Sequence, residues 1–330
     1  METVLLSPDD VEECLEIEEV VSAVEEAFKA EALGHTQMPA KSYVTLPEYN
    51  GDFRSMPAYL DTGEWDAAAV KWVNVHPENP DDYDLPTVLG TLIYSDPANG
   101  FPLAVMDGTT ITRERTGAAS AVATDYLAIE DAQSLGIVGA GVQAYTQLEA
   151  IASVRPIEEV VVSDVNEAVK EQFISHFQER FDVRGGSTEE AAACDVLSTV
   201  TPAREPLISR RDVGEHTHIN AVGADAEGKQ ELDAEILLDA KLVIDDIDQC
   251  THSGEINVPW SDGVVTRDNL HGDIGDIVAG NIDGRTDEDG ITVFDSTGLG
   301  IQDVATAHVA YAHAKEQDIG TRFPLVTANV

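Results

Sequence analysis

The chain has 330 residues and carries 62 Asp and Glu against 19 Lys and Arg, so its formal net charge is −43. Such a surface repels phosphate backbones and anionic lipids, which argues against nucleic acid or a membrane as the main partner. Because 43% of the residues are hydrophobic, one large or two ordinary cores can form, and global disorder is not expected. A small-molecule ligand is favoured by elimination.

The acidic excess is scattered along the whole chain rather than gathered in a tail, a distribution typical of a solvated surface coat. Repulsion among so many carboxylates destabilises a compact state unless counterions screen it. We therefore predict a protein from the salt-rich cytoplasm of a halophile, with an ordinary acidic protein as the alternative.

The cysteines and the opening residues bear on metal binding and location. Cys14, Cys194 and Cys250 are odd in number and far apart, which indicates neither a disulfide framework nor a cysteine-based metal site, so no metal is expected. The first residues turn acidic at once and lack the positive start of a secretory signal. No apolar run approaches the ~20 residues of a membrane span, and a cytoplasmic protein is expected.

The first third of the chain changes from a helical to a strand-like pattern. Residues 9–33 carry apolar side chains at helical spacing, and Gly34 follows as a candidate C-cap. Between 41 and 108 we expect strands in the runs SYVTLP, AAAVKWVNVH, PTVLGTLIYSD and FPLAVMDG, the last two joined by a turn at 97–100. This part predicts a domain built on an antiparallel sheet.

Beyond residue 112 the pattern alternates between helices and strands. A helix is expected through RTGAASAVATDYLAI, followed by the apolar strands SLGIVGAG, EEVVVSD, CDVLSTVT, THINAVGA, AKLVIDD and ITVFDSTG. Strands that alternate with helices in this way predict βαβ units and a parallel sheet. A last helix over 301–316 is expected to return to the first domain.

The most specific motif is the glycine-rich turn GIVGAGVQA, which follows an apolar strand and opens a helix. Gly139 permits a tight turn, Gly141 lets the backbone approach a pyrophosphate, and Ala144 allows close helix packing. Asp164 ends the next strand, where a dinucleotide site needs a carboxylate for the ribose hydroxyls. With no arginine beside Asp164, NAD is preferred over NADP; a structural turn with a surface aspartate is the alternative.

Three cations of this acidic chain lie at or beside apolar segments. Lys71 lies within AAAVKWVNVH, Arg54 precedes Met-Pro, and Arg115 lies in ITRERTGAAS. A charge within an apolar strand needs a partner, and together these side chains could hold a carboxylate. Each one taken singly is as well explained by an ion pair with a structural aspartate.

A further polar cluster follows the expected strand HINAVG. Asp225 emerges there at the carboxyl edge of the sheet, the side where doubly wound folds bind ligands, and Lys229 follows four residues later. A carboxylate at this place could exchange a proton with an amine or a water. An aspartate that only forms a loop turn remains the alternative.

The strings RTGAAS, GAGVQAY, HINAVGADAEGKQELD and DSTGLGIQD resemble the ornithine cyclodeaminase and mu-crystallin family, whose members bind NAD(P). Within that family, ALGHTQMPAKSY, RSMPAYL, KWVNVHPENP and SGEINV are most similar to the archaeal alanine dehydrogenase branch. The resemblance extends over essentially the whole chain.

The resemblance implies a homodimer of an α/β fold class. A Rossmann NAD-binding domain at 116–303 is expected beside an α+β substrate-binding and dimerisation domain with an antiparallel sheet, at 1–115 and 304–330. The resemblance also implies Asp225 as the catalytic acid or base, with Lys71 and Arg115 at the substrate carboxylate or the nicotinamide region. We therefore expect Asp225 and Lys71 to be the catalytic residues, and Arg54, Lys71 and Arg115 to bind the substrate. The residues implied to border the cofactor are Thr87, Arg115, Thr116, Gly139, Gly141, Val142, Gln143, Asp164, Thr201, Val222, Gly223, Lys229 and Ser296.

Position 54 bears on the choice of substrate. In the cyclodeaminases of this family the corresponding residue resembles an acid suited to a distal amino group, whereas Arg54 would repel the ornithine ammonium and attract a carboxylate. We therefore expect reversible NAD-dependent deamination of a small amino acid, L-alanine, to pyruvate and ammonia. An ornithine cyclodeaminase that forms L-proline, a ketimine reductase and a mu-crystallin-like NAD(P)H-binding protein remain as alternatives.

Overall fold

The structure is a computed structural model that describes residues 2–326, and it separates the chain into two units. The first unit comprises Met1–Arg115 and Leu299–Val330, and the second comprises Thr116–Gly298. From the sequence we placed the last boundary after residue 303. The structure places it earlier because the last long helix begins at Gly300, against the first sheet: a Cβ on Gly300 would lie 3.1 Å from that of Ala58. Residues 1 and 327–330 of the expected first domain lie outside the described part.

An eight-stranded, mainly antiparallel sheet forms the first unit, as expected. Its strands are β1 (Thr3–Leu6), β2 (Thr36–Gln37), β3 (Ser42–Leu46), β4 (Gly51–Asp61), β5 (Asp66–Val75), β6 (Val88–Ser95), β7 (Pro102–Asp107) and β16 (Thr321–Phe323). Their order is β16-β1-β7-β6-β5-β4-β2, with β3 also paired to β4. One pair, β1 with β7, is parallel, which the sequence analysis did not anticipate.

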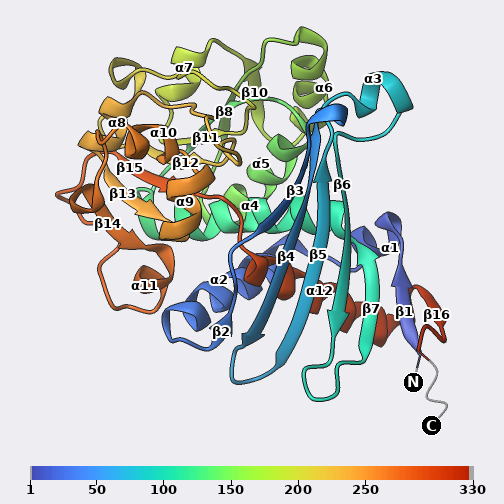
Figure 1. The fold of residues 1–330 in the computed structure, drawn as a ribbon. Helices are drawn as coiled ribbons and strands as arrows, with labels where there is room; N and C mark the ends of the chain where they lie inside the picture. Colours follow the sequence, from blue (N-terminus) through green and yellow to red (C-terminus); the bar gives the residue numbers. More distant parts are fainter. Residues whose placement is uncertain (1, 327–330) are drawn as a thin grey trace. The chain divides into compact units, whose positions relative to one another are not determined.

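The helices of this unit are α1 (Pro8–Glu13), α2 (Ile17–Ala32), η1 (Pro47–Tyr49), α3 (Asn79–Tyr83) and α12 (Gly300–Gln317). Of these, α2 and α12 pack against each other and against the sheet. Figure 1 shows α12 running across β4 to β7. Alternate residues of β4 and β5 point to the buried face, and the side chains between them lie on the other face.

Two expectations for the first unit are wrong in detail. The helix expected over 9–33 is two helices, because α1 ends with Cys14 as its C-cap and Glu16 is extended before α2 begins. The longest strand, β4, did not show in the sequence pattern, since Arg54 and Pro57 interrupt its apolar alternation.

The second unit contains a parallel eight-stranded sheet, which confirms the expected βαβ arrangement. Its strands are β8 (Ser134–Val138), β9 (Glu159–Ser163), β10 (Asp182–Gly185), β11 (Val196–Thr199), β12 (His218–Ala221), β13 (Lys241–Ile244), β14 (Leu270–Asp273) and β15 (Thr292–Asp295). They lie in the order β10-β9-β8-β11-β12-β15-β13-β14, every pair parallel. The six predicted strands are present, and β10 and β14 extend the two edges.

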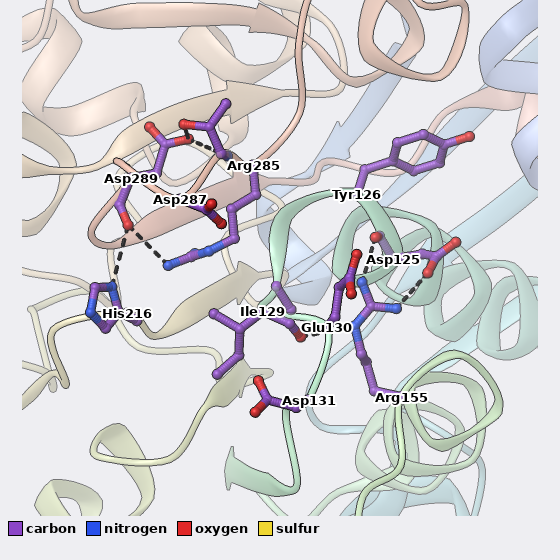
Figure 2. Close-up of a pocket in the computed structure, with 12 residues that line it drawn as sticks. Asp125, Tyr126, Ile129, Glu130, Asp131, Arg155, His216, Arg285, Asp287 and Asp289 are labelled. Carbon is purple, nitrogen blue, oxygen red and sulfur yellow. Dashed lines mark hydrogen bonds and ion pairs between the residues drawn. The ribbon is translucent and has the colours of Figure 1, made fainter.

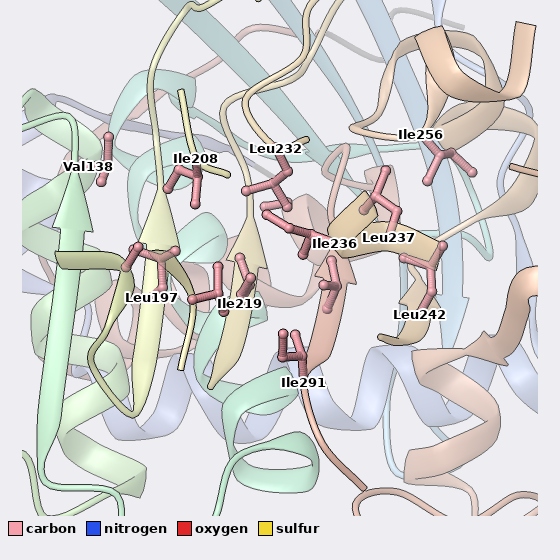
Figure 3. Packing of buried hydrophobic residues seen from close by; sticks show 14 of the residues in the cluster. Val138, Leu197, Ile208, Ile219, Leu232, Ile236, Leu237, Leu242, Ile256 and Ile291 are labelled. Carbon is pink, nitrogen blue, oxygen red and sulfur yellow. The ribbon is translucent and has the colours of Figure 1, made fainter. Parts of the chain in front are cut away.

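Two apolar clusters fill the space between this sheet and its helices. The helices are α4 (Gly108–Leu127, which contains the unit boundary), α5 (Val142–Val154), α6 (Glu167–Phe177), α7 (Thr188–Ala192), η2 (Arg210–Asp212), α8 (Ala234–Asp239), α9 (Ile247–Ser253), α10 (Asn257–Ser261), η3 (Arg267–Asn269) and α11 (Ile274–Val278). Leu148 and Phe173 belong to the cluster beneath α5 and α6. Leu197, Ile219 and Ile236 belong to the other, beneath α8 (Figure 3). Within residues 2–326, none of the helices combines the length and apolar content that a membrane crossing needs.

Candidate active site

The glycine-rich turn of the second unit joins β8 to α5. Gly139 has φ +99°, and a Cβ there would lie 2.9 Å from the carbonyl oxygen of Val200, so this position requires glycine. Gly141 is the N-cap of α5 and has open space where a Cβ would be. The turn therefore leaves room beside a helix N-terminus whose first backbone N–H groups have no partner within the helix.

Asp164 follows β9 and lies beside this turn. Its Oδ2 accepts a hydrogen bond from the backbone N–H of Ala140 at 2.7 Å, and its Oδ1 accepts one from Asn166 at 2.7 Å. Asp164 thus fixes the glycine turn while half-exposed. Each oxygen keeps a further lone pair that could accept a ribose hydroxyl.

The residues of this edge fit a dinucleotide. The open space at Gly141 accommodates the close approach of a phosphate, and Oε1 of Gln143, on the first turn of α5, is buried without a hydrogen-bond partner among the described residues. An unsatisfied buried acceptor of this kind is costly unless a ligand or water completes it.

Several expected cofactor residues share the carboxyl edge of the parallel sheet. Thr201 and Val222 follow β11 and β12, and Ser296 follows β15. In parallel strands the carboxyl ends meet at one edge, which is where Gly139 and Asp164 also lie. Thr116 is the first residue of the second unit, on α4, where its carbonyl accepts the side-chain amide of Gln147 at 3.3 Å. Thr87 belongs to the first unit, just before β6.

Asp225 lies on the loop that follows β12. Lys229 Nζ donates to Asp225 Oδ1 at 2.5 Å, a pair four residues apart within that loop. Both side chains are partly exposed, so the pair is open to solvent at the carboxyl edge. A carboxylate held beside an ammonium in this position can accept a proton from a bound amine or water.

In the first unit, Arg54 lies on the buried face of β4. Its Nε donates to Asp52 Oδ1 at 2.8 Å and its Nη2 to Asp52 Oδ2 at 3.2 Å. The guanidinium also lies over the ring of Tyr43, 5.6 Å from its centroid. One partner of this cation is therefore Asp52, two residues earlier on the same strand.

Lys71 lies on the buried face of β5, diagonal to Arg54 across the β4–β5 pair. Its Nζ donates to Asp303 Oδ1 at 2.6 Å, and both side chains are 1% exposed. Arg115 Nε lies 3.4 Å from the same oxygen, and its Nη1 donates to Gln302 Oε1 at 3.3 Å. Burial lowers the pKa of Lys71 to about 7, against the opposing attraction of Asp303.

Sequence reasoning missed three charged residues. Asp303 and Glu231 lie inside the strings DSTGLGIQD and HINAVGADAEGKQELD, yet neither was given a role. Lys41, in ALGHTQMPAKSY, lies near enough to Lys71 to lower its pKa further. For Asp303, its place in the first turn of an otherwise apolar helix could have indicated a buried acid.

A pocket of about 460 Å³ lies at the opposite, amino-terminal edge of the second unit's sheet (Figure 2). Arg155 donates there to the carboxylate of Asp125 and to the carbonyl of Ile129. Arg285 donates to the carbonyl of Leu127. Because both arginines are bound to the carboxyl end of α4, they stabilise that helix end, and we assign the pocket a structural role apart from the candidate site. Among residues 2–326, no cluster of His, Cys, Asp or Glu has the arrangement of a metal site.

Known proteins resemble this chain over nearly its whole length. The model of the ornithine cyclodeaminase/mu-crystallin family matches residues 1–318. The chain belongs to this family. One relative within it, the alanine dehydrogenase of Archaeoglobus fulgidus, is 48% identical over 323 residues, which cover 98% of each chain.

Solved structures of similar proteins share the fold over nearly the whole length. An archaeal alanine dehydrogenase dimer with bound NAD has a TM-score of 0.94 and 47% identity, covering 99% of this chain and 100% of the other. The Delta(1)-pyrroline-2-carboxylate reductase of Thermococcus litoralis, in complex with NADH and L-proline, has a TM-score of 0.92 and 40% identity, covering 97% and 99%. The expected fold class is thereby confirmed.

Proposed function

We propose that this protein is an NAD-dependent alanine dehydrogenase, which converts L-alanine, water and oxidised NAD reversibly into pyruvate, ammonium, NADH and a proton. The observation that carries the proposal is the 48% identity, over 98% of both chains, to the alanine dehydrogenase of Archaeoglobus fulgidus. The charges described for each unit support it, as follows.

The second unit would bind the dinucleotide. Gly139, Gly141 and the N-terminus of α5 would hold the pyrophosphate, and Asp164 would accept the ribose hydroxyls. NAD, when bound, accepts the hydride from the substrate Cα. The residues that complete this assignment are Thr87, Arg115, Thr116, Val142, Gln143, Thr201, Val222, Gly223, Lys229 and Ser296.

The first unit would bind the carboxylate of the amino acid. Arg54, Lys71 and Arg115 are three buried cations, and two of them, Lys71 and Arg115, share Asp303. A substrate carboxylate that they bind would lie in a buried environment, where such an interaction is strong. It would also favour the protonated form of Lys71, whose pKa burial has lowered to about 7.

Asp225 would carry the proton transfers. In its ionised form it would take a proton from the substrate ammonium and release it to solvent. It would then remove a proton from the water that attacks the imine and pass it to the departing amine. Lys229 Nζ donates to Asp225 Oδ1 at 2.5 Å, which would hold this carboxylate in place at the carboxyl edge of the sheet.

The outer face of the first unit's sheet suits a second copy of the chain. Val44, Trp72 and Ile93 are between 39% and 49% exposed, and Trp72 stacks on Phe53 at 5.1 Å. Large apolar side chains gathered on one sheet face mark an interaction surface. A homodimer through this face predicts that Ile93→Lys lowers the sedimentation coefficient to that of one chain.

A cytoplasmic location is proposed on the acidic surface and on the three cysteines, all of which are buried thiols without a disulfide.

One other reaction of this family is favoured by a specific observation. The 40% identity to a pyrroline-2-carboxylate reductase makes reduction of a cyclic imine the second candidate. Such a substrate also carries a carboxylate, so Lys71 and Arg115 suit it as well. The two reactions differ in the amino acid that drives NADH formation.

The proposal is tested with the purified full chain in molar KCl, supplied with NAD and with alanine, ornithine or proline in separate assays. Formation of NADH with alanine, and little with proline, supports the dehydrogenase. Formation of NADH with proline but not alanine supports the reductase instead. Conversion of ornithine to proline without net NADH would identify a cyclodeaminase.

A further inference from the structure

The loop Gly223–Gln230, which carries Asp225 and Lys229, is closed at its base by a buried glutamate. Glu231 Oε2 accepts the backbone N–H of Gly223 at 3.0 Å, so one carboxylate joins the two ends of the loop. Glu231 is fully buried, and a Cβ on Gly223 would lie 2.5 Å from Glu231 Oε2. The loop start therefore requires glycine for the carboxylate to reach it.

The same carboxylate also holds the neighbouring loop. Glu231 Oε1 accepts both the backbone N–H and the hydroxyl of Thr201, each at 2.7 Å. Thr201 follows β11, whereas the Asp225 loop follows β12. Three donors thus converge on one side chain that links two adjacent loops at the carboxyl edge.

A second buried glutamate supports the first. Glu255 accepts the backbone N–H groups of Glu231 at 2.9 Å and of Leu232 at 2.7 Å, and Asp295 in turn accepts that of Glu255 at 2.8 Å. At the tip of the loop, Asn257 accepts the backbone N–H of Gly228 at 2.9 Å. The loop is therefore tied at its base and at its tip.

Burying these acids is energetically costly. Burial raises the pKa of Glu231, and burial together with the charge of Glu231 raises the pKa of Glu255 well above its usual range. Apolar residues of similar size would fill this space at less cost. What they could not do is accept three N–H and O–H groups from two loops at once.

We infer that Glu231 is a positioning residue for Asp225, holding the Asp225 loop in register with the loop of Thr201. The role rests on the proposed function only in so far as Asp225 transfers protons. We call the hydrogen bonds from Gly223 and Thr201 to Glu231 the clamp. A displacement of about 1 Å in a reacting group can lower a rate about 100-fold, so loss of the clamp should lower turnover more than substrate affinity.

The test compares Glu231→Gln with Glu227→Gln, an exposed glutamate on the same loop. A glutamine amide presents N–H groups to Gly223 or Thr201 in place of an acceptor. We expect E231Q to lower kcat for alanine about 10- to 100-fold while KM for alanine changes less than about twofold, since the carboxylate-binding cations lie in the first unit. E227Q should change neither. Wild-type kcat in folded E231Q would overturn the inference, even with a lower melting temperature.

Amide hydrogen exchange provides a readout that needs no substrate. In the wild type, the amides of Thr201 and Gly223 should exchange as slowly as those of β12, although both lie in loops, and E231Q should accelerate them selectively. Rapid exchange of Gly223 in the wild type would contradict the clamp whether or not E231Q folds. Slow exchange in a protein inactive towards alanine would overturn the proposed function and leave the clamp standing.

Discussion

Lys71 Nζ and Asp303 Oδ1 lie 2.6 Å apart, and neither side chain is more than 1% exposed. The pair joins the middle of β5 to the first turn of α12, which are 232 residues apart in sequence. Removing Asp303 takes this partner from the buried ammonium of Lys71, whereas removing Lys71 still leaves Asp303 beside Arg115. The pair therefore couples the protonation of Lys71 to the packing of α12 against the sheet.

The first prediction concerns Asp303→Asn and the pH profile of alanine binding. Burial holds the pKa of Lys71 at about 7 even with Asp303 present, and the asparagine would remove the attraction that opposes burial. The pKa of Lys71 should therefore fall. Because we propose that protonated Lys71 binds the carboxylate, the decline of kcat/KM for alanine at alkaline pH should begin at a lower pH in the variant than in the wild type. If the decline of kcat/KM at alkaline pH occurs at the same pH in both proteins, Lys71 does not bind the substrate as a cation.

The second prediction concerns Arg54. Losing a charged hydrogen-bond partner costs about 1.5–3 kcal/mol, so Arg54→Gln should raise KM for alanine by roughly one to two orders of magnitude. Asp52→Asn is the matched control, since it removes one anionic partner of Arg54 and keeps the cation. In Asp52→Asn, KM for alanine should stay unchanged or fall. An unchanged KM in Arg54→Gln would place Arg54 outside substrate binding.

The third prediction concerns Asp225. Asp225→Asn should retain shape and NADH binding, measured by fluorescence, but lower kcat about 10²- to 10⁴-fold by removing the proton acceptor. Asp233→Asn, at the N-cap of α8, is a control for aspartate loss elsewhere in the unit and should affect stability rather than turnover. Unchanged turnover in Asp225→Asn would leave only a role in forming the loop.

The fourth prediction concerns cofactor choice. A 2′-phosphate placed beside Asp164 would meet negative charge, and Val165, Asn166 and Glu167 supply no cation. Asp164→Ser should weaken NAD binding and reduce the difference between the affinities for NAD and for NADP. Part of the loss should come from the glycine turn, because Asp164 also holds the N–H of Ala140. A wild-type enzyme that prefers NADP would contradict this assignment.

The fifth prediction concerns salt. The Debye length falls from about 10 Å at 0.1 M to about 3 Å at 1 M salt, so added KCl should weaken repulsion within a chain of net charge −43. The melting temperature should rise steeply between about 0.1 M and about 2 M KCl. A flat melting temperature over this range would remove the inference of a halophilic protein.

Local signals made much of the fold predictable. The glycine turn at Gly139 and the carboxylate at Asp164 follow from spacing along the chain, and the structure places them side by side. The parallel strands of the second unit follow from buried apolar runs of four or five residues. Fully buried strands of this kind carry a strong local pattern.

The polar partners could not be predicted in the same way. Among 62 acids, Asp303 and Glu231 look like members of a surface coat, and only the fold shows that both are buried. Asp52 and Arg54 stand two residues apart, the spacing of neighbours on one face of a strand. That pair was missed because β4 itself was not recognised.

The central claim is that hydride leaves the Cα of alanine. The direct measurement incubates the full chain, in molar KCl, with oxidised NAD and L-alanine deuterated at Cα, and analyses the nicotinamide by mass spectrometry. The account predicts one deuterium in each NADH formed and one pyruvate for each NADH. Absence of NADH with alanine, while the same preparation reduces a cyclic imino acid or converts ornithine to proline, would contradict it.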